Sequence, residues 1–301
     1  MYSALQLLRC APFALYLNRS LQYITVPIIQ ENAMCNLNKS IPVFSGRIDA
    51  ASYKDIAISL DAPEGKEPLV MLKDYGIACE SFYARHDGKN RPYCRSIEGA
   101  LDDVWLRQGV AEKLCNVNRR LEKFNVEVFV FNGYRPIECQ RGLWRYFSEK
   151  IAKDNPNLND HEKYKLVIQF VSDPTQFSLS DYRTWPTHSS GGAVDLGLRC
   201  KESGALLDMG SAFDEMSEIS YTVAYEVKLA KSEITQKDHR LINRRILYNS
   251  MILEGFTNYP QEYWHFDFGN QMHTFISQSL KRVDAPCMAV YGYIEPPRKP
   301  S

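Results

Sequence analysis

The sequence predicts a globular protein of the α+β class, because helical and strand patterns both occur along the chain. Residues 110–124 and 137–151 carry apolar side chains at helical spacing, whereas residues 125–131 and 193–198 have the composition or the alternation of strands. Apolar residues make up 45% of the 301 positions and aromatic residues 12%, which is enough for a sizeable core. We therefore expect a folded main domain of mixed secondary structure.

The clearest linker is Asp61–Pro68, since it combines two prolines, a glycine and alternating charges. We place the main boundary there. It divides an N-terminal extension of unknown role, residues 1–65, from a main domain, residues 66–290. The proline-rich end, residues 291–301, is expected to form a tail.

The first regular elements of the main domain are a helix and a strand. Five apolar residues recur at spacings of four and three: Val110, Leu114, Val117, Leu121 and Phe124. Asn125–Phe131 is rich in β-branched and aromatic residues and ends at the turn signal Asn132-Gly133. Pro136 then suits the first turn of a helix whose apolar stripe is Ile137, Trp144, Phe147 and Ile151. Arg135 is thereby predicted at a strand-to-helix junction.

A second strand and a final helix with a strand follow. In residues 193–198, three large apolar side chains alternate with Ala193, Asp195 and Gly197, so Asp195 lies on a face of small residues. Apolar residues around position 242 indicate a helix that stops near Gly255. The aromatic segment 254–269 leads into a last strand.

The charge balance limits the classes of partner. The chain has 36 Lys and Arg against 36 Asp and Glu, so no net field attracts nucleic acid or an anionic membrane. No stretch approaches the roughly 20 apolar residues of a membrane span. The first residues lack a basic start and Arg9 interrupts their apolar run, so no export signal is predicted. We expect a small-molecule substrate and a cytoplasmic protein, with a periplasmic or secreted location and the oligomeric state left open.

The cysteines and most of the histidines do not indicate a functional site. Eight widely spaced cysteines form no C-x-x-C pair, which argues against a cysteine zinc site and favours free thiols, although an even number still permits disulfides. Four histidines are expected at the surface: His86, His161, His239 and His273. The two others, His188 and His265, are candidate site residues.

His188 and His265 each lie near a carboxylate. His188 and Asp195 are seven residues apart and separated mostly by small residues, which leave volume for a metal ion and a substrate. Glu262 stands three residues before His265. Two imidazoles and one carboxylate with a free fourth position are typical of catalytic zinc. Taken singly, each histidine is also explained as a capping or packing residue.

Five ordered segments resemble one enzyme family. His188-x-x-Gly191-x-Ala193-x-Asp195, followed by Glu262-Tyr263-Trp264-His265, is similar to the paired signatures of the zinc D-alanyl-D-alanine dipeptidases. These enzymes are related to zinc D,D-carboxypeptidases and share the Hedgehog-type fold. Three further segments match: Gly133-Tyr134-Arg135-Pro136, Met209-Gly210-Ser211-x-Phe213-Asp214-x-Met216, and Asn243-Arg244-Arg245 leading to Gly255-Phe256. The resemblance covers roughly residues 69–270 and implies a central antiparallel sheet flanked by helices.

The resemblance also implies the roles of the chemical groups. One zinc ion per chain would have three ligands, His188, Asp195 and His265. Zinc lowers the pKa of a bound water towards about 7, and Glu262 would be the base that takes its proton. Arg135 would bind the carbonyl oxygen and stabilise the charge that develops there.

Two further residues are implied in substrate binding. Asp214 would hold the free amino group of a dipeptide, and Thr187 would contact the substrate next to His188. Pro186 and Thr187 stand where the family usually carries serines, so this edge of the site departs from the family pattern.

One feature of the last motif needs an irregular backbone. In a regular strand Glu262 and His265 point to opposite faces, because an offset of three is odd against a period of two. Pro260 indicates a turn or bulge just upstream, which would re-aim Glu262 towards the metal.

Three other functions stay open beside a dipeptidase of peptidoglycan metabolism. A D,D- or L,D-carboxypeptidase would cut longer wall peptides, but an amine contact at Asp214 favours a dipeptide. A non-haem iron enzyme can use the same ligand types, but an adjacent Glu262 favours hydrolysis. A non-catalytic module would keep the metal without turnover, and the presence of Glu262 and Arg135 together argues against it.

Overall fold

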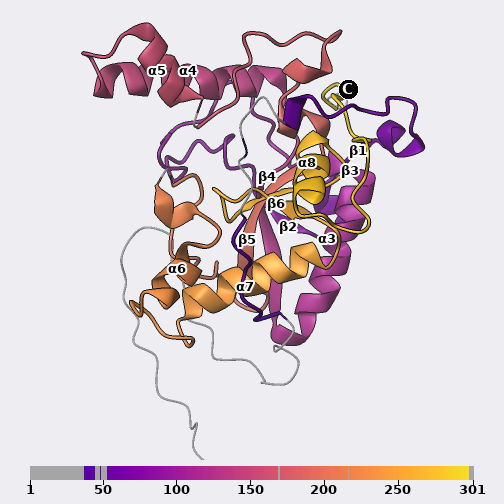
Figure 1. The fold of residues 1–301 in the computed structure, drawn as a ribbon, viewed down its shortest axis with the longest axis vertical. Coiled ribbons are helices and arrows are strands. Elements are labelled where there is room, and N and C mark those ends of the chain that lie inside the picture. The colour runs from indigo at the N-terminus through magenta and orange to yellow at the C-terminus, as the bar shows by residue number, and fades with distance from the viewer. Residues whose placement is uncertain (1–36, 45–47, 49–52, 169, 216, 298–301) are drawn as a thin grey trace, which may run out of the picture.

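A five-stranded sheet forms the centre of the protein in the computed structural model, which describes residues 37–44, 48, 53–168, 170–215 and 217–297 (Figure 1). The strand order is β2-β4-β5-β7-β6. Neighbours are antiparallel except for the parallel pair β2 and β4. The strands are β2 (Ala78–Cys79), β4 (Val126–Asn132), β5 (Ala193–Cys200), β6 (Thr257–Asn258) and β7 (His265–Asp267). A separate antiparallel pair joins β1 (Leu69–Met71) to β3 (Trp105–Arg107).

Helices flank this sheet. α3 contacts β4, while α7 contacts β5, β6 and α3, so both pack on the central strands. α8 contacts β6, and α4 and α5 form a pair far from α7 (Figure 1). The helices are α3 (Gln108–Leu121), α4 (Ile137–Asp154), α5 (Asp160–Val167), α6 (Ala224–Ala230), α7 (His239–Ile252) and α8 (Gln271–Ser279). The predicted α+β class with a central sheet flanked by helices is confirmed, and the predicted antiparallel pairing holds for every pair of neighbours in this sheet except β2 and β4.

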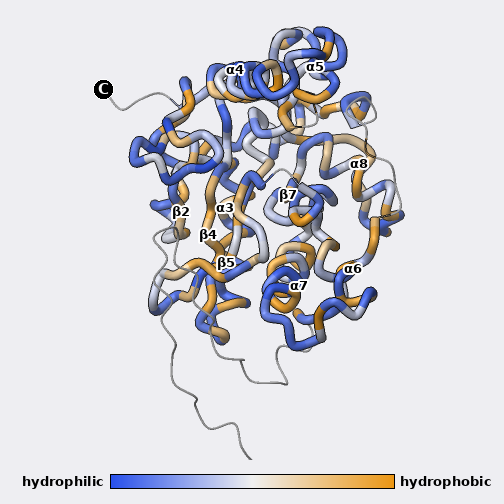
Figure 2. Tube along the Cα trace, turned by 90° about the vertical axis from the view of Figure 1, so that its left-hand side faces the viewer, coloured by the Kyte–Doolittle hydropathy of each residue, from blue (hydrophilic) through white to orange (hydrophobic). Residues whose placement is uncertain are grey.

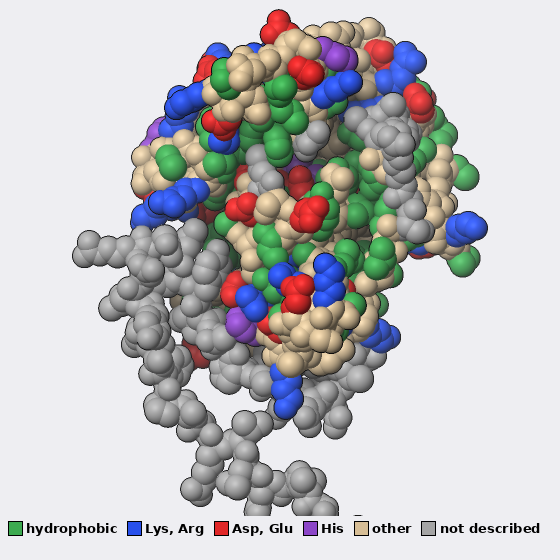
Figure 3. Space-filling model, turned by 60° about the vertical axis from the view of Figure 1, so that its left-hand side comes forward, with side chains coloured by type: hydrophobic (Ala, Val, Ile, Leu, Met, Phe, Trp, Pro, Cys, Tyr) green, Lys and Arg blue, Asp and Glu red, His purple; other side chains and the backbone are tan. Residues whose placement is uncertain are grey.

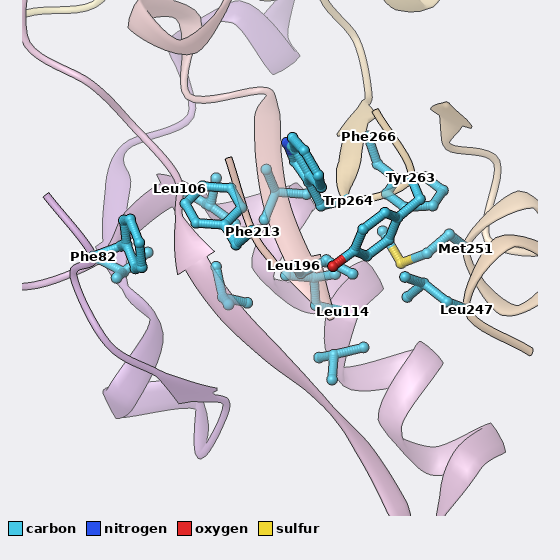
Figure 4. Close-up of a cluster of buried hydrophobic side chains, with 14 of the residues drawn as sticks. Phe82, Leu106, Leu114, Leu196, Phe213, Leu247, Met251, Tyr263, Trp264 and Phe266 are labelled. Atoms are coloured by element: carbon cyan, nitrogen blue, oxygen red, sulfur yellow. The ribbon is translucent and has the colours of Figure 1, made fainter. Parts of the chain in front are cut away.

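The apolar face of β5 explains why the sheet and helices associate. Its alternating large side chains are buried in the same cluster as residues of α3 and α7. Leu196 lies among Leu114, Leu247 and Met251 (Figure 4). Burying each such side chain contributes about 1.5–3 kcal/mol relative to exposure. Hydrophobic segments accordingly gather along α3, β4, β5 and α7 (Figure 2).

The opposite face of the sheet carries Asp195 and the end of β4. Val130 pairs with Leu196, but the register then shifts, and Asn132 pairs with Asp195. Without the shift, Asn132 would share the core face with Val130, because side chains alternate along a strand. The irregularity at residue 131 therefore re-aims the Asn132 side chain towards Asp195.

The described ends of the chain contact the main domain. Leu37 is buried in the main core, and Ile58 forms a bridge with Ala289. Near the C-terminus, Tyr291 is buried in the same core, and the backbone of Ile294 bonds to that of Ser189. The boundaries at residues 65 and 291 stay predictions, and residues 1–36 and 298–301 lie outside the described parts.

Two further expectations concern the described residues. None of their helices has both the length and the apolar composition needed to cross a bilayer. The cysteines within these parts are free thiols, whereas Cys10 and Cys35 lie outside them.

Candidate metal centre

Three side chains converge on the small-residue face of the sheet. Asp195 of β5 and His265 of β7 are direct partners across the antiparallel pair, which places their side chains on one face and next to each other. His188 comes from the 3₁₀ turn Thr187–Ser190. Gly191 ends this turn at φ 71°, and a Cβ there would approach the Leu69 Cδ2 atom to 2.7 Å. The three side chains are buried, with relative exposures of 7%, 2% and 8% for His188, Asp195 and His265.

The spacing of the ligand atoms fits one metal ion. His188 Nε2 lies 3.3 Å from Asp195 Oδ2, and His265 Nδ1 lies 3.0 Å from Asp195 Oδ1. One potential ligand atom from each of the three side chains lies within 4.8 Å of the others. Ligand atoms about 2.0–2.1 Å from a tetrahedral zinc ion would lie roughly 3.3 Å from each other. The donor set and its spacing therefore suit zinc.

Hydrogen bonds on the side away from the site orient each imidazole so that its other nitrogen faces Asp195. His188 Nδ1 lies 2.8 Å from the Gly133 carbonyl oxygen, which can only accept, so this nitrogen carries the proton and Nε2 keeps its lone pair. His265 Nε2 lies 3.0 Å from Asp267 Oδ2, so the other nitrogen, Nδ1, faces the site and Asp195 Oδ1. Asn270 in turn donates to Asp267 at 2.7 Å. Such outer partners orient metal ligands in known metal sites.

The charges of the cluster also favour a cation. Burial lowers the pKa of His188 to about 3, so its imidazole is neutral at pH 7. Burial alone would raise the pKa of Asp195, but His188, His265 and Arg135 outweigh it and lower that pKa. Asn132 adds a hydrogen bond to Asp195 Oδ2 at 2.8 Å. Asp195 and His188 thus have the ionised and neutral forms that bind metal. Burial alone would lower the pKa of His265, but Asp267 and Asp195 raise it, so this imidazole gives up a proton when a metal binds.

Arg135 lies at the junction between β4 and α4, as the sequence predicts. Its Nη1 donates to Gln140 Oε1 at 3.0 Å, and its Nη2 is 3.7 Å from Asp195 Oδ2. The guanidinium stacks 5.0 Å from the Tyr83 ring. Burial alone would lower the pKa of Arg135, but Tyr83 and Asp195 raise it, so the group is charged. The buried Nε has no hydrogen-bond partner among the described residues.

Glu262 lies in a turn before β7, where the sequence predicts an irregular backbone. Its backbone N–H donates to the Tyr259 carbonyl at 3.0 Å, and its own carbonyl accepts from Asn258 at 3.0 Å. The turn brings Glu262 Oε2 to 3.8 Å from His265 Nδ1. A third of the side chain is exposed, yet the surrounding protein desolvates the carboxyl enough to raise its pKa to about 7.

Asp214 reaches the same site from the segment between β5 and α6. Its backbone is left-handed, with φ 59°. The hydroxyls of Tyr83 and Tyr93 both donate to Asp214 Oδ2 at 3.0 Å. Tyr83 also accepts from Arg135 Nη2 at 3.3 Å and so links the two groups. Burial, together with the charge of Asp195, raises the pKa of Asp214 to about 7.

Thr187 is oriented differently. Its hydroxyl donates to the Tyr53 hydroxyl at 3.5 Å, and the residue lines a small cavity with Trp185, Pro186 and Tyr293. A second small cavity, next to Arg135, is lined by Tyr83, Asn132 and Cys139 among others. One face of the molecule is hollowed, with acidic side chains visible inside the hollow (Figure 3). The structure therefore brings six of the seven predicted site residues together and places the Thr187 hydroxyl against Tyr53.

Several residues of the site were not anticipated. Asp267 carried a signal, because it lies two residues beyond His265 and therefore on the same strand face. Asn132 depends on the register shift, and Tyr83 and Tyr93 come from an irregular segment without a recognisable pattern. The expectation of a surface position is wrong for His273, which is 8% exposed and bonds through Nε2 to the Gly255 carbonyl at 2.9 Å.

The site combines two buried imidazoles and a carboxylate with a nearby glutamate and a buried guanidinium, which is typical of metallohydrolases. A family model described as "D-ala-D-ala dipeptidase" matches residues 100–285, and the chain belongs to this family, Peptidase M15. The family that the sequence motifs indicated is confirmed.

Relatives named D-alanyl-D-alanine dipeptidase align with about two thirds of this chain. A D-alanyl-D-alanine dipeptidase of Synechocystis is 31% identical over 63% of this chain and 79% of its own length. One of Streptomyces coelicolor is 35% identical over 66% of this chain and 89% of its own length. The solved structure of VanYB in complex with D-alanine-D-alanine is 14% identical, with a TM-score of 0.33 over 64% of this chain and 92% of that chain. A TM-score of 0.33 is too low to support a conclusion about the fold or the function.

Proposed function

We propose that the protein is a zinc-dependent dipeptidase that hydrolyses D-alanyl-D-alanine, or a similar D-containing dipeptide, in peptidoglycan metabolism. The family and the names of the relatives support the substrate class. The observation that carries the proposal is the convergence of His188, Asp195 and His265, with Glu262 Oε2 3.8 Å from His265 Nδ1. A ligand set with an adjacent carboxylate is what metal-assisted hydrolysis requires.

The three ligands would hold one zinc ion through His188 Nε2, the Asp195 carboxylate and His265 Nδ1. Bound there, zinc would supply a Lewis acid and lower the pKa of a coordinated water towards about 7. The Gly133 carbonyl and Asp267 hold the two imidazoles in orientation.

Glu262 is the proposed general base. Its pKa of about 7 lies near neutral pH, where a carboxylate is both partly ionised and basic enough to take a proton. The same carboxyl group would then give that proton to the leaving amine. Its partial exposure of 33% keeps it accessible to solvent and substrate.

Arg135 and Asp214 are the proposed substrate contacts. The Arg135 guanidinium, with Nε free of other partners among the described residues, would bind the scissile carbonyl oxygen as negative charge develops on it. Asp214 would pair with the free amino group of the dipeptide while Tyr83 and Tyr93 fix its carboxyl group. A longer, acylated peptide lacks this amine, so the pair would restrict substrate length. Thr187 stays a proposed contact at the neighbouring edge.

The test compares substrates of different length. We expect D-alanyl-D-alanine to be cleaved, an N-acylated tripeptide ending in D-Ala-D-Ala to be cleaved far more slowly, and chelation to stop turnover until zinc is restored. Preferential cleavage of the acylated peptide would show a carboxypeptidase. Turnover restored by ferrous iron and an oxidant would show a redox enzyme, and binding without cleavage would show a non-catalytic module. Cell fractionation tests the cytoplasmic location that we propose.

A further inference from the structure

Two adjacent arginines of α7 are buried but serve different parts of the molecule. Arg244 and Arg245 have relative exposures of 2% and 3%. Arg245 pairs with Glu226, with nitrogen to oxygen distances of 2.6 and 2.7 Å, and also bonds to Gln236 and Ser40. Arg244 instead faces the segment that carries Asp214. The proposed chemistry uses neither of them.

Arg244 holds both ends of that segment. Its Nε donates to the Met209 carbonyl at 2.7 Å, at the end of the segment N-terminal to Asp214. On the other side, Nη1 and Nη2 donate to the carbonyls of Tyr221 and Ile219, each at 2.6 Å. A longer bond of 3.3 Å joins Nη2 to Ser211 Oγ. One planar group therefore fixes the distance between the two ends.

The surroundings of Arg244 make this arrangement rigid. Its guanidinium lies 4.8 Å from the Tyr225 ring and 4.5 Å from the Tyr263 ring. Burial lowers its pKa to about 10, which still leaves it charged at neutral pH. A buried cation is costly unless its N–H groups are satisfied, so the four hydrogen bonds strongly favour this one geometry.

Asp214 depends on this segment for its position. Its left-handed backbone, at φ 59°, is disfavoured for a residue other than glycine and needs support from its neighbours. Phe213 supplies part of that support by stacking on Phe131, with ring centroids 4.8 Å apart. The turn of Glu262 has anchors of its own in Asn258 and the Tyr259 carbonyl, and the next residue, Tyr263, also donates its N–H to the Ser220 carbonyl at 2.9 Å.

We propose that Arg244 is a positioning residue for amine recognition, which places the Asp214 carboxylate at the distance from Arg135 that a dipeptide requires. This inference rests on the proposed role of Asp214. Because Asn258 and the Tyr259 carbonyl still hold the Glu262 turn when the hydrogen bonds of Arg244 are lost, that loss affects substrate binding more than the chemical step. The effect appears in KM rather than in kcat.

The test compares Arg244→Lys with Arg245→Lys. The second variant removes a similarly buried guanidinium from the same helix. Lysine keeps the charge but cannot reproduce several bonds in one plane. We expect KM for D-alanyl-D-alanine to rise about tenfold or more in Arg244→Lys with kcat within about threefold, and to change less than about twofold in Arg245→Lys. Backbone hydrogen exchange should accelerate in residues 209–215 and 217–221 of Arg244→Lys alone.

A double-mutant cycle separates positioning from general damage. If Arg244 acts through Asp214, then Arg244→Lys adds less than about twofold to the KM of Asp214→Asn, because neighbouring residues with a shared function are not additive. Equal KM changes in both lysine variants, or full additivity with Asp214→Asn, would overturn the inference while leaving the dipeptidase intact. If the unmutated zinc-loaded chain neither binds nor cleaves the dipeptide, the proposed function fails and the inference with it.

Discussion

The two sides of the site are built in different ways. On the metal side, Asp195 and His265 are direct partners on neighbouring strands, and backbone pairing fixes their separation. On the amine side, Asp214 lies on an irregular segment whose ends are held by the side chain of Arg244. Groups placed by a sheet move only if the sheet does, whereas a segment held by side-chain bonds can shift when one of them is lost. We therefore expect changes on the metal side to abolish activity and changes on the amine side to alter affinity and specificity.

The largest effect is expected from Asp195→Asn. The neutral amide removes the one negative ligand and leaves the buried Arg135 without its nearby carboxylate. We expect zinc content to fall close to zero and D-alanine release to fall below detection. Metal analysis after dialysis, together with an activity assay, measures both. A variant that retained zinc and most of its activity would remove Asp195 from the ligand set.

A smaller effect on the same side is expected from Asp267→Asn. Asp267 accepts from His265 Nε2 and from Asn270, so the amide weakens the orientation of one ligand without removing it. Loss of such a partner lowers metal affinity by about 10- to 100-fold. Competition with a chelator of known affinity measures the change. Asp181→Asn, at a residue that bonds to the exposed Arg183, is the control and should leave zinc affinity unchanged.

The same contrast explains what the sequence could predict. Alternation along residues 193–198 placed Asp195 on a face of small residues, and Pro260 indicated the turn that re-aims Glu262, because both follow from local backbone rules. The bonds of Tyr83 and Tyr93 to Asp214, and those of Arg244 to its segment, join residues far apart in the chain. No period or turn signal encodes them. The position of Asn132 was missed because a register shift reverses the face that alternation predicts.

The pH dependence of dipeptide binding tests whether Asp214 recognises the amino group of the substrate. The Asp214 carboxyl has a pKa raised to about 7, so it is ionised above that pH and neutral below it. Only the ionised form attracts an ammonium group. Dipeptide binding should therefore weaken as pH falls from 7.5 to 5.5, by up to about tenfold per unit. A zinc cation nearby lowers the pKa and moves this change to lower pH.

Calorimetry in a Glu262→Ala background isolates this titration from that of the base, with zinc content checked at each pH. In Asp214→Asn the affinity should be lower and nearly independent of pH over this range. An equally steep dependence in both proteins would exclude Asp214 as the titrating group.

The smallest effect is expected from Thr187→Val. The Thr187 hydroxyl is 3.5 Å from that of Tyr53, a distance at the limit of a hydrogen bond. We expect KM and kcat to change by less than about threefold, since a weak neutral contact contributes about 0.5 kcal/mol or little more. Steady-state kinetics measures this directly. A KM increase above tenfold would show that the hydroxyl binds the substrate and that this edge contributes to recognition.

The most direct test of the central claim, metal-assisted hydrolysis with Glu262 as the base, is D-alanine release by the unmutated chain and by Glu262→Ala at matched zinc content. General-base catalysis contributes about 10²- to 10⁴-fold, so we expect kcat to fall by that factor while zinc stays bound. Dipeptide affinity should change little. Unchanged turnover in the zinc-loaded variant would contradict the assignment of the base, and no turnover by the unmutated chain at full zinc content would contradict the proposed hydrolysis itself.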